Sequence, residues 1–295
     1  MKHRKYEGFN LVELVIVIAI TGVIAAASVV FFKPAIDAYF DSSRRAELTD
    51  FADTALRRIA RDVRSAVPNS IRSPNNQCFE LVPTSAGGRF RTDPDTVNDS
   101  GPNCVPGPGC SAPLDLTQPA TVFDVLSPLS SVPAVSDWVV IGNQNTNDVY
   151  AASSPTRARI TAVATPNVNF GTQRITITST QFPAGYDGGR FTIVPNNGGS
   201  PAIVYVCSNP GTTSNGDGTG TVFRVARAFD ATYPTACPDT TGGAVVVTRV
   251  SRCNFVYTPN QGETQQSGFV WMELELAEKG ESISLSFGAH VDNVP

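Results

Sequence analysis

The sequence is poor in the residues that most metal sites and nucleophilic sites require. It has only two histidines, His3 and His290, and none of its six cysteines forms a Cys-x-x-Cys pair. A zinc site usually needs closer ligand spacing and more histidine, so we expect no metal and no cofactor. A Ser-His-Asp triad would have to use His290, a few residues before Pro295, which disfavours this kind of catalysis. Beyond Pro68 there is one lysine, Lys279, and no strand–helix context for a phosphate-binding loop.

Two acidic pairs and one loop are the remaining candidates for chemistry. Asp93/Asp95 and Glu273/Glu275 have the residue type that a glycoside hydrolase uses. On a strand, however, Glu273 and Glu275 share one face, and we predict a solvated row of carboxylates. Residues 215–219 resemble a calcium loop weakly but lack the bidentate Glu at the twelfth position, which favours a turn. The sequence therefore predicts a protein that is not an enzyme.

The N-terminus contains a long apolar run. A short leader with Lys2, Arg4 and Lys5 comes first, and Glu13 is the only charged residue between positions 9 and 32. A basic leader of this kind stays in the cytoplasm under the positive-inside rule. At about 1.5 Å per residue, a helix over residues 14–32 is long enough to cross a hydrocarbon core of about 30 Å. A plain signal anchor explains this hydropathy as well as any more specialised segment does.

Residues 8–13, Gly-Phe-Asn-Leu-Val-Glu, narrow these alternatives. With the basic leader and the apolar run in register, they resemble the type III signal of the type IV pilin and type II secretion pseudopilin superfamily. The resemblance implies cleavage after Gly8, N-methylation of Phe9 and an assembly role for Glu13, which is fifth counted from Phe9. The implied partners are a prepilin peptidase/methyltransferase, other minor and major pilins, the pilus assembly platform and the inner membrane.

A physical reason for Glu13 accompanies this resemblance. A charged side chain at the centre of a membrane helix costs about 2.5–3.5 kcal/mol on insertion scales, and no nearby residue of this chain offers a partner. The resemblance implies subunits that pack their apolar helices at the centre of a fibre. There Glu13 would pair with the freed amine of Phe9 on a neighbouring subunit, which offsets the desolvation of both groups.

The pattern becomes amphipathic after Lys33-Pro34. We expect a kink or local melting near residues 30–34, because proline removes a donor and clashes with the preceding turn. An ion pair between Asp53 and Arg57 fits the helical i,i+4 spacing, and the arginines of residues 57–64 are interleaved with acids. We therefore interpret them as a solvated or subunit-facing surface and not a nucleic-acid site. The helix is predicted to end at Pro68, and its apolar face is Ile36, Tyr39, Phe40, Leu48, Phe51, Ala52, Ala55, Leu56, Ile59, Val63 and Val67.

The rest of the chain is rich in Gly, Pro, Ser, Thr, Asn and Val and is predicted to form a large β-rich head. Apolar and polar residues alternate in several segments, with β-branched and aromatic residues enriched. The fold class is therefore α+β, with an antiparallel, disulfide-bonded sheet packed on the distal part of the helix. The predicted strands are residues 122–126, 138–141, 174–178, 190–194, 203–207, 222–228, 244–250, 254–257, 268–275 and 282–287.

All six cysteines lie in this head, and an even number outside the cytoplasm favours disulfides. Six cysteines allow fifteen pairings. A bridge between Cys104 and Cys110 is sterically easy, and Cys207 has Cys237 or Cys253 as a candidate partner on a neighbouring strand. Each bridge is expected to contribute about 2–4 kcal/mol. The candidates are Cys78, Cys104, Cys110, Cys207, Cys237 and Cys253.

Several head segments and the distal helix carry a second resemblance. They resemble minor pilin-like proteins of the mannose-sensitive haemagglutinin (MSHA) pilus biogenesis group. The segments are residues 57–64, 205–207, 251–255, 280–285 and 290–295. Residues 57–64 also resemble J-type pseudopilins. The chain departs from that pattern in its Cys-flanked Pro/Gly loop and at residues 211–220.

Together these observations predict three parts: a cleaved cytoplasmic leader at 1–8, a pilin-type helix at 9–67 with a membrane span at about 14–32, and a periplasmic or extracellular head at 68–295. The resemblance implies a single-pass inner-membrane precursor that enters a pilus or pseudopilus as a structural subunit of the initiating or tip complex. The alternatives are a tip adhesin that binds a surface or glycan and, less favoured, a membrane-anchored periplasmic hydrolase. The mildly acidic net charge of −4 gives no argument for nucleic-acid binding.

Overall fold

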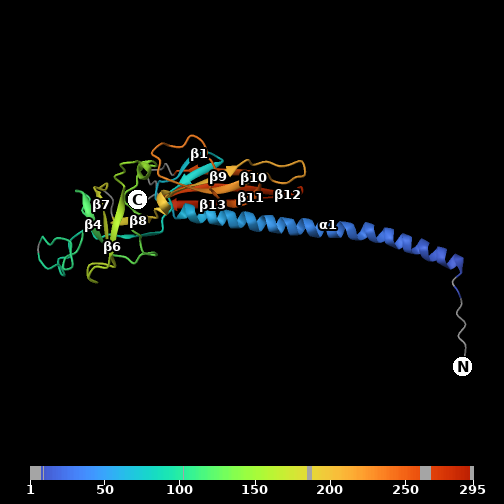
Figure 1. Cartoon of the computed structure of the whole chain (residues 1–295), viewed down its shortest axis with the longest axis horizontal. Coiled ribbons are helices and arrows are strands. Elements are labelled where there is room, and N and C mark those ends of the chain that lie inside the picture. Colours follow the sequence, from blue (N-terminus) through green and yellow to red (C-terminus); the bar gives the residue numbers. More distant parts are fainter. Residues whose placement is uncertain (1–7, 9, 102, 185–187, 260–266, 293–295) are drawn as a thin grey trace, which may run out of the picture.

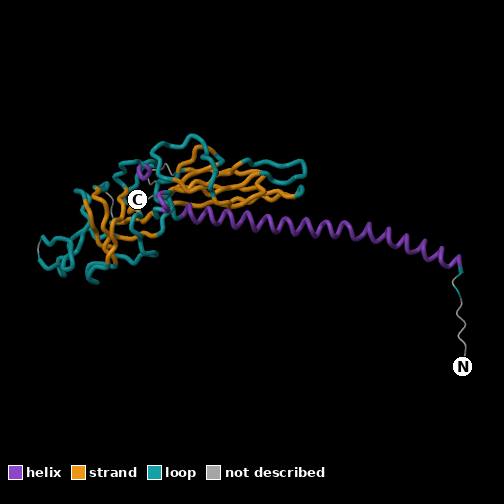
Figure 2. Tube along the Cα trace, viewed as in Figure 1, coloured by secondary structure: helices purple, strands orange, loops and turns teal. Residues whose placement is uncertain are grey.

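A single long helix, α1 (Leu11–Arg64), precedes every strand and extends far beyond them (Figure 1). The computed structural model describes residues 8, 10–101, 103–184, 188–259 and 267–292. Figure 2 shows the strands gathered at one end of the molecule, with the N-terminal part of α1 alone at the other. The predicted order of a helix followed by an antiparallel β-rich head is confirmed.

The helix runs through Pro34 without interruption, so the predicted local melting near residues 30–34 is wrong. Proline removes one amide donor, and its ring presses on the carbonyl four residues earlier. On a helix with no packed neighbour, a gentle curve accommodates both effects, and Figure 1 shows such a curve.

The helix also ends earlier than predicted, at Arg64 instead of near Pro68. The Ser65 amide donates to the Arg61 carbonyl (3.1 Å) and closes the last turn. The next residues then pair with an extended segment of the head: the Val67 amide donates to the Val82 carbonyl, and the Thr84 amide donates to the Ser65 carbonyl, both at 2.8 Å. Sheet-type hydrogen bonds thus replace the last helical ones.

The head contains two antiparallel sheets. The seven-stranded sheet lies beside the second half of α1 (Figure 1) in the order β1-β2-β9-β10-β11-β12-β13. The six-stranded sheet lies beyond the end of the helix in the order β3-β8-β5-β6-β7-β4. The strands are β1 (Arg72–Asn75), β2 (Cys78–Leu81), β3 (Ala86–Arg89), β4 (Ala120–Val125), β5 (Trp138–Val140), β6 (Arg157–Ala164), β7 (Gln173–Thr180), β8 (Arg190–Val194), β9 (Ala202–Ser208), β10 (Gly220–Arg227), β11 (Ala244–Thr258), β12 (Ser267–Glu278) and β13 (Glu281–Asp292), with 3₁₀ turns η1 (Asp148–Tyr150) and η2 (Asn197–Gly199).

Each sheet has its own apolar core. The second half of α1 packs against β11, β12 and β13, as the amphipathic pattern predicts. Its buried residues are Leu48, Ala52, Ala55, Leu56, Ile59, Ala60 and Val63. The six-stranded sheet buries a separate cluster around Phe123, Phe191 and Ile193.

The predicted strands are all present, with two differences in the sheets. Residues 244–250 and 254–257 form the single strand β11, whose register shifts between Val250 and Arg252 beside Arg249, a residue with positive φ (63°). Four strands were not predicted: β1, β2, β3 and β6. The first three are only four residues long, and β6 carries alanines, which have a low β propensity.

Three disulfides staple the head: Cys78–Cys237, Cys104–Cys110 and Cys207–Cys253. The predicted Cys104–Cys110 bridge is confirmed. Cys207 pairs with Cys253 and not with Cys237. That bridge joins β9 to β11, which the strand order separates by β10, so it fastens two strands that are not neighbours in the sheet.

Candidate functional site

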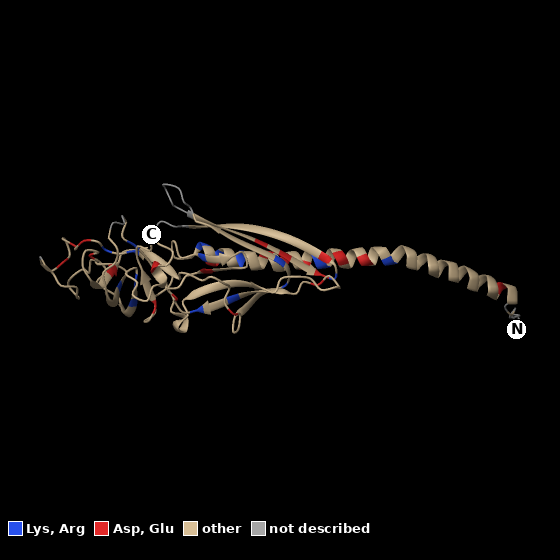
Figure 3. Ribbon diagram, turned by 90° about the horizontal axis from the view of Figure 1, so that it is seen from above, with Lys and Arg blue, Asp and Glu red and all other residues tan. Residues whose placement is uncertain are grey.

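The largest exposed apolar surface lies on the N-terminal half of α1. Between Leu11 and Phe32 its large apolar side chains are 47–79% exposed, although soluble domains rarely expose contiguous apolar patches of this extent. Figure 3 shows that this half carries almost no charge, whereas acidic and basic residues crowd the half beside the head. The helix is long and apolar enough to span a membrane, and no other part of the chain that the structure describes covers its apolar segment.

Glu13 lies in the first turn of this exposed half. Its backbone amide donates to the Asn10 carbonyl (3.0 Å), which begins the helix. A carboxylate in a first turn interacts favourably with the helix dipole. Within the described residues the Glu13 side chain has no ion pair or hydrogen bond. Gly8 is exposed, with open space around its Cα, while Phe9 lies outside the described residues.

Exposed apolar side chains continue past the membrane-length segment. Ile36, Tyr39 and Phe40 are 52–72% exposed, and Tyr39 and Phe40 touch edge to face. The predicted apolar face of the helix is therefore divided: from Leu48 onward it is buried under the head, with Phe51 still 42% exposed, and before Leu48 it is open. Apolar area left open in this way is available for contact with another molecule.

Polar contacts hold the second half of α1 on the seven-stranded sheet. Asp62 Oδ2 accepts hydrogen bonds from the Tyr205 hydroxyl (2.7 Å) and Arg224 Nε (2.9 Å). Burial, reinforced by Asp62, raises the pKa of Tyr205 well above its usual value, so the phenol stays a donor. Nearer the exposed half of α1, Arg45 Nε donates to Glu281 Oε2 (2.5 Å). These contacts fix where the exposed part of the helix begins.

The arginines of residues 57–64 point mostly away from the head. The predicted i,i+4 pair is confirmed, with Arg57 Nε 2.6 Å from Asp53 Oδ2. Arg58, Arg61 and Arg64 are exposed, and the Arg64 guanidinium lies 5.8 Å from the centre of the Phe287 ring.

A buried ion pair that the sequence did not reveal lies within the hairpin β1–β2, between residues directly opposite each other on the two strands. Arg72 Nη2 lies 2.6 Å from Glu80 Oε2, and both side chains are 1% exposed. Arg72 also donates to the Asp230 carbonyl (3.0 Å), and its guanidinium stacks 3.5 Å from the centre of the Tyr150 ring in η1. Burial raises the pKa of Glu80, and Arg72 opposes this shift. The sequence offered no signal for this pair because the short hairpin itself was not predicted.

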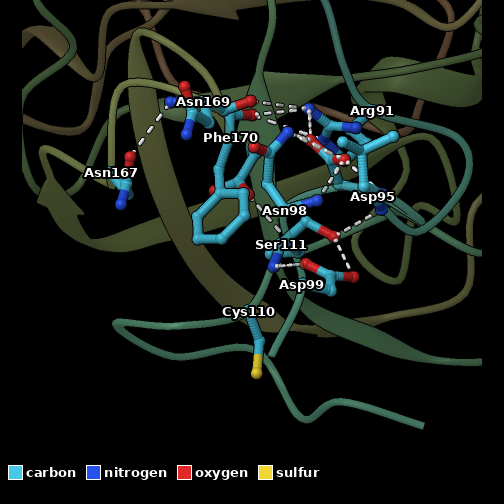
Figure 4. A network of polar contacts seen from close by, with 12 residues as sticks. Arg91, Asp95, Asn98, Asp99, Cys110, Ser111, Asn167, Asn169 and Phe170 are labelled. Atoms are coloured by element: carbon cyan, nitrogen blue, oxygen red, sulfur yellow. Dashed lines mark hydrogen bonds and ion pairs between the residues drawn. The ribbon is translucent and has the colours of Figure 1, made fainter. Parts of the chain in front are cut away.

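Asp95 belongs to a hydrogen-bonded loop (Figure 4), and Asp93 lies two residues before it. Asp95 accepts from Asn98 and lies 3.6 Å from Arg91 Nη2, and hydrogen bonds from Asn98 lower the pKa of Asp95. The Thr92 hydroxyl donates to Asp93 Oδ2. A carboxyl whose pKa is lowered is a poor general acid, because catalytic acids of this class have a raised pKa.

The other predicted acidic pair is bridged by one arginine. Glu273 and Glu275 lie on β12, and Arg252 contacts both carboxylates at 3.2 and 3.3 Å. The predicted row of carboxylates on one face of the strand is present, and Arg252 links its two members. His290 lies on β13 with its ring 4.9 Å from that of Phe269.

The loop at residues 215–219 forms the predicted turn. Gly216 has positive φ (78°), and Asp217 Oδ1 accepts the Lys279 amide (2.8 Å). In the part of the chain that the structure describes, no group of three or more His, Cys, Asp or Glu side chains is arranged to hold a metal ion.

Comparisons of the chain with protein-family profiles, with curated proteins and with solved structures find no match.

Proposed function

We propose that the chain is a minor pilin-like structural subunit of a type IV pilus, of the MSHA kind, or of a secretion pseudopilus. In this proposal a prepilin peptidase cuts after Gly8, the new N-terminus at Phe9 is methylated, and the subunit leaves the inner membrane for the fibre. Its partners are other pilins and the assembly platform. One observation carries the proposal: the apolar half of α1 is exposed, and Glu13, its only charged residue before Lys33, has no partner among the described residues.

The physical argument concerns what can cover that surface. Lipid satisfies the apolar side chains of a single helix but gives no partner to a carboxylate. A bundle of such helices satisfies both requirements, because apolar side chains pack together and each carboxylate meets a cationic amine from a neighbour. Such a pair needs good geometry to offset the desolvation of both charges. The open side chains at Ile36, Tyr39 and Phe40 extend the same packing surface toward the head.

The shape of the head favours a position at the fibre end. The six-stranded sheet lies beyond the end of α1, away from the membrane segment (Figure 1). In a continuous shaft that space belongs to the next subunit, whereas at the tip it is free. The proposed place is therefore an initiating or tip complex.

A second candidate is a tip adhesin that binds a surface or glycan. The observation that favours it is the position of the six-stranded sheet, which is the part of the head farthest from the exposed helix (Figure 1). A deletion strain distinguishes the two functions. Loss of fibres supports the assembly role, while normal fibres without attachment support adhesion.

The assembly role is tested with Glu13→Leu and Glu13→Gln in cells that build the fibre. We expect both variants to enter the membrane normally and to be lost from sheared fibres, because the charge pair can no longer form. Asp50→Asn is the matched control, since Asp50 is an exposed acid on the same helix without an ion pair in the described structure. Normal incorporation of Glu13→Leu would contradict this role for Glu13.

A further inference from the structure

A hollow of about 470 Å³ lies where the end of α1 meets the six-stranded sheet. Its floor is formed by Gly87, Thr192 and Val140, which are in register across β3, β8 and β5. Residues 65–68, just after the helix, form one wall. The volume falls within the range of about 300–1,000 Å³ that is typical of small-molecule sites.

Alternation along β8 decides which side chains face this hollow. Phe191 and Ile193 are buried in the core of the six-stranded sheet, so Arg190 and Thr192 lie on the opposite face. On β3, Arg89 is directly opposite Arg190 in the register. Both arginines line the hollow, and Arg64 joins them from the last turn of α1.

This arrangement of charge is unfavourable in the free protein. Like charges directly opposite on neighbouring strands destabilise a sheet. Arg64, Arg89 and Arg190 have no acidic partner among the described residues, whereas Arg72 and Arg174 of the same head are each paired with a buried carboxylate.

The floor holds a second unfavourable group. Thr192 Oγ1 is buried and has no hydrogen-bond partner within the described structure. A buried hydroxyl without a partner costs free energy in the free protein. The wall and the floor also offer small apolar contacts from Ala66 and Val140.

We propose that this hollow is a binding site for a small anionic ligand of about the size of one acidic sugar. A carboxylate, sulfate or phosphate of the ligand accepts hydrogen bonds from Arg89 and Arg190, with Arg64 at the rim. The rest of the ligand packs on the apolar part of the wall and floor. The site does not depend on the role of α1 in a fibre.

The test uses the full chain in detergent micelles and isothermal titration calorimetry. The probes are glucuronate, glucose 6-sulfate and glucose 6-phosphate, with glucose as the uncharged control, so that the three anions are compared on the same ring. We expect saturable binding of at least one anion and none of glucose. Arg89→Gln and Arg190→Gln should each weaken that binding at least about tenfold, because charge-assisted hydrogen bonds are the strong ones.

Arg58→Gln is the matched control, since Arg58 is exposed on α1 and does not line the hollow. It should leave the affinity unchanged. Absence of saturable binding for all three anions, or equal affinity in the Arg89→Gln, Arg190→Gln and Arg58→Gln variants, would overturn the site.

A second measurement needs no ligand. If Arg89 and Arg190 repel each other in the free protein, removing either charge should raise the melting temperature by about 1–3 °C. A fall in melting temperature for both variants would mean that the two arginines stabilise the fold, and the proposal would be wrong.

Discussion

The two halves of α1 differ both in apolar content and in surroundings. From Leu48 to Val63 the apolar side chains other than Phe51 are buried under β11, β12 and β13, while from Leu11 to Phe32 they are all open. The buried half is amphipathic, with acids and arginines on its outer face (Figure 3). The exposed half is apolar all round, which a helix in water cannot sustain.

This difference leads us to expect that one half of the helix stabilises the head and that the other half serves insertion or assembly. Contacts of the second half stabilise the head, and changes there should alter the free energy of unfolding. Contacts of the first half are proposed to lie outside the chain, in lipid or other subunits, and on this proposal changes there should alter insertion or assembly while the head stays equally stable. Both tryptophans, Trp138 and Trp271, lie in the head, so their fluorescence reports unfolding of the head alone.

The largest expected effect comes from the buried ion pair of the head. Arg72→Met leaves the buried Glu80 carboxylate with only the more distant Arg227 (Nε 3.9 Å from Glu80 Oε1) and should destabilise the head by about 3–5 kcal/mol at pH 8. In denaturant the tryptophans and the second half of α1 should unfold together, while the first half stays helical in micelles. Hydrogen exchange along α1 measures the unfolding of each half directly. Simultaneous loss of protection in both halves would contradict the prediction that they unfold separately.

The pH dependence of this variant has a defined sign. The pKa of Glu80 is raised in the folded protein, so a folded protein with neutral Glu80 is favoured at low pH and this contribution is lost as pH rises through the folded pKa. Without Arg72 the pKa of Glu80 should rise further. The destabilisation by Arg72→Met should therefore be smaller at pH 5 than at pH 8, and an equal loss at both would contradict the assignment.

The next largest difference in stability is expected between two leucine substitutions, one in each half of α1. Leu56→Ala empties a position that is 2% exposed and should cost about 2–5 kcal/mol of unfolding free energy. Leu14→Ala removes the same atoms from a position that is 55% exposed, and should change head stability by less than about 0.5 kcal/mol. Chemical denaturation followed by tryptophan fluorescence compares the two. Similar losses would show that the head depends on the exposed half.

The hydrogen bonds of Asp62 near the end of α1 are expected to contribute less to the free energy of unfolding. Asp62→Ala leaves the buried Tyr205 hydroxyl without its acceptor and should cost about 1.5–3 kcal/mol. Tyr205→Phe in the same background should recover part of that loss, because no donor then lacks a partner. Asp53→Ala, which breaks only the exposed pair with Arg57, is the control and should cost less than about 1 kcal/mol.

The smallest effect is expected at the boundary between the halves. Arg45→Gln removes the partly exposed pair with Glu281 and should cause only a small loss of stability in low salt, the smallest of these variants. Salt screens such pairs, so the difference from the unsubstituted protein should vanish near 1 M NaCl. A cost that persists in high salt would mean that Arg45 packs against the head in another way.

Much of this architecture could be predicted from local patterns. The unbroken apolar run and the spacing from Leu48 to Val67 predict the helix and its buried face, because both patterns act over one or two turns. Alternating β-branched residues likewise predicted most strands. Strands β1 and β3 were missed because Arg72–Asn75 and Ala86–Arg89 have little β propensity, and long-range pairing decides their conformation.

The features that depend on distant contacts could not be predicted. The Arg72–Glu80 pair requires the hairpin β1–β2, and the pairing of Cys207 with Cys253 requires the strand order. The exposed face at Ile36 and Phe40 was predicted as part of one continuous apolar stripe, and only the position of the head shows where burial stops. The hollow beside Thr192 brings together segments that are far apart in the sequence.

The N-terminus of the protein purified from fibres or membranes tests the central claim most directly. The exposed half of α1 is proposed to pack with other subunits through Glu13 and the amine freed at Phe9, and that amine exists only after cleavage. Intact mass and N-terminal sequencing should find a chain that begins with N-methylated Phe9. A chain that begins at Met1, or beyond Ala27, would contradict the account.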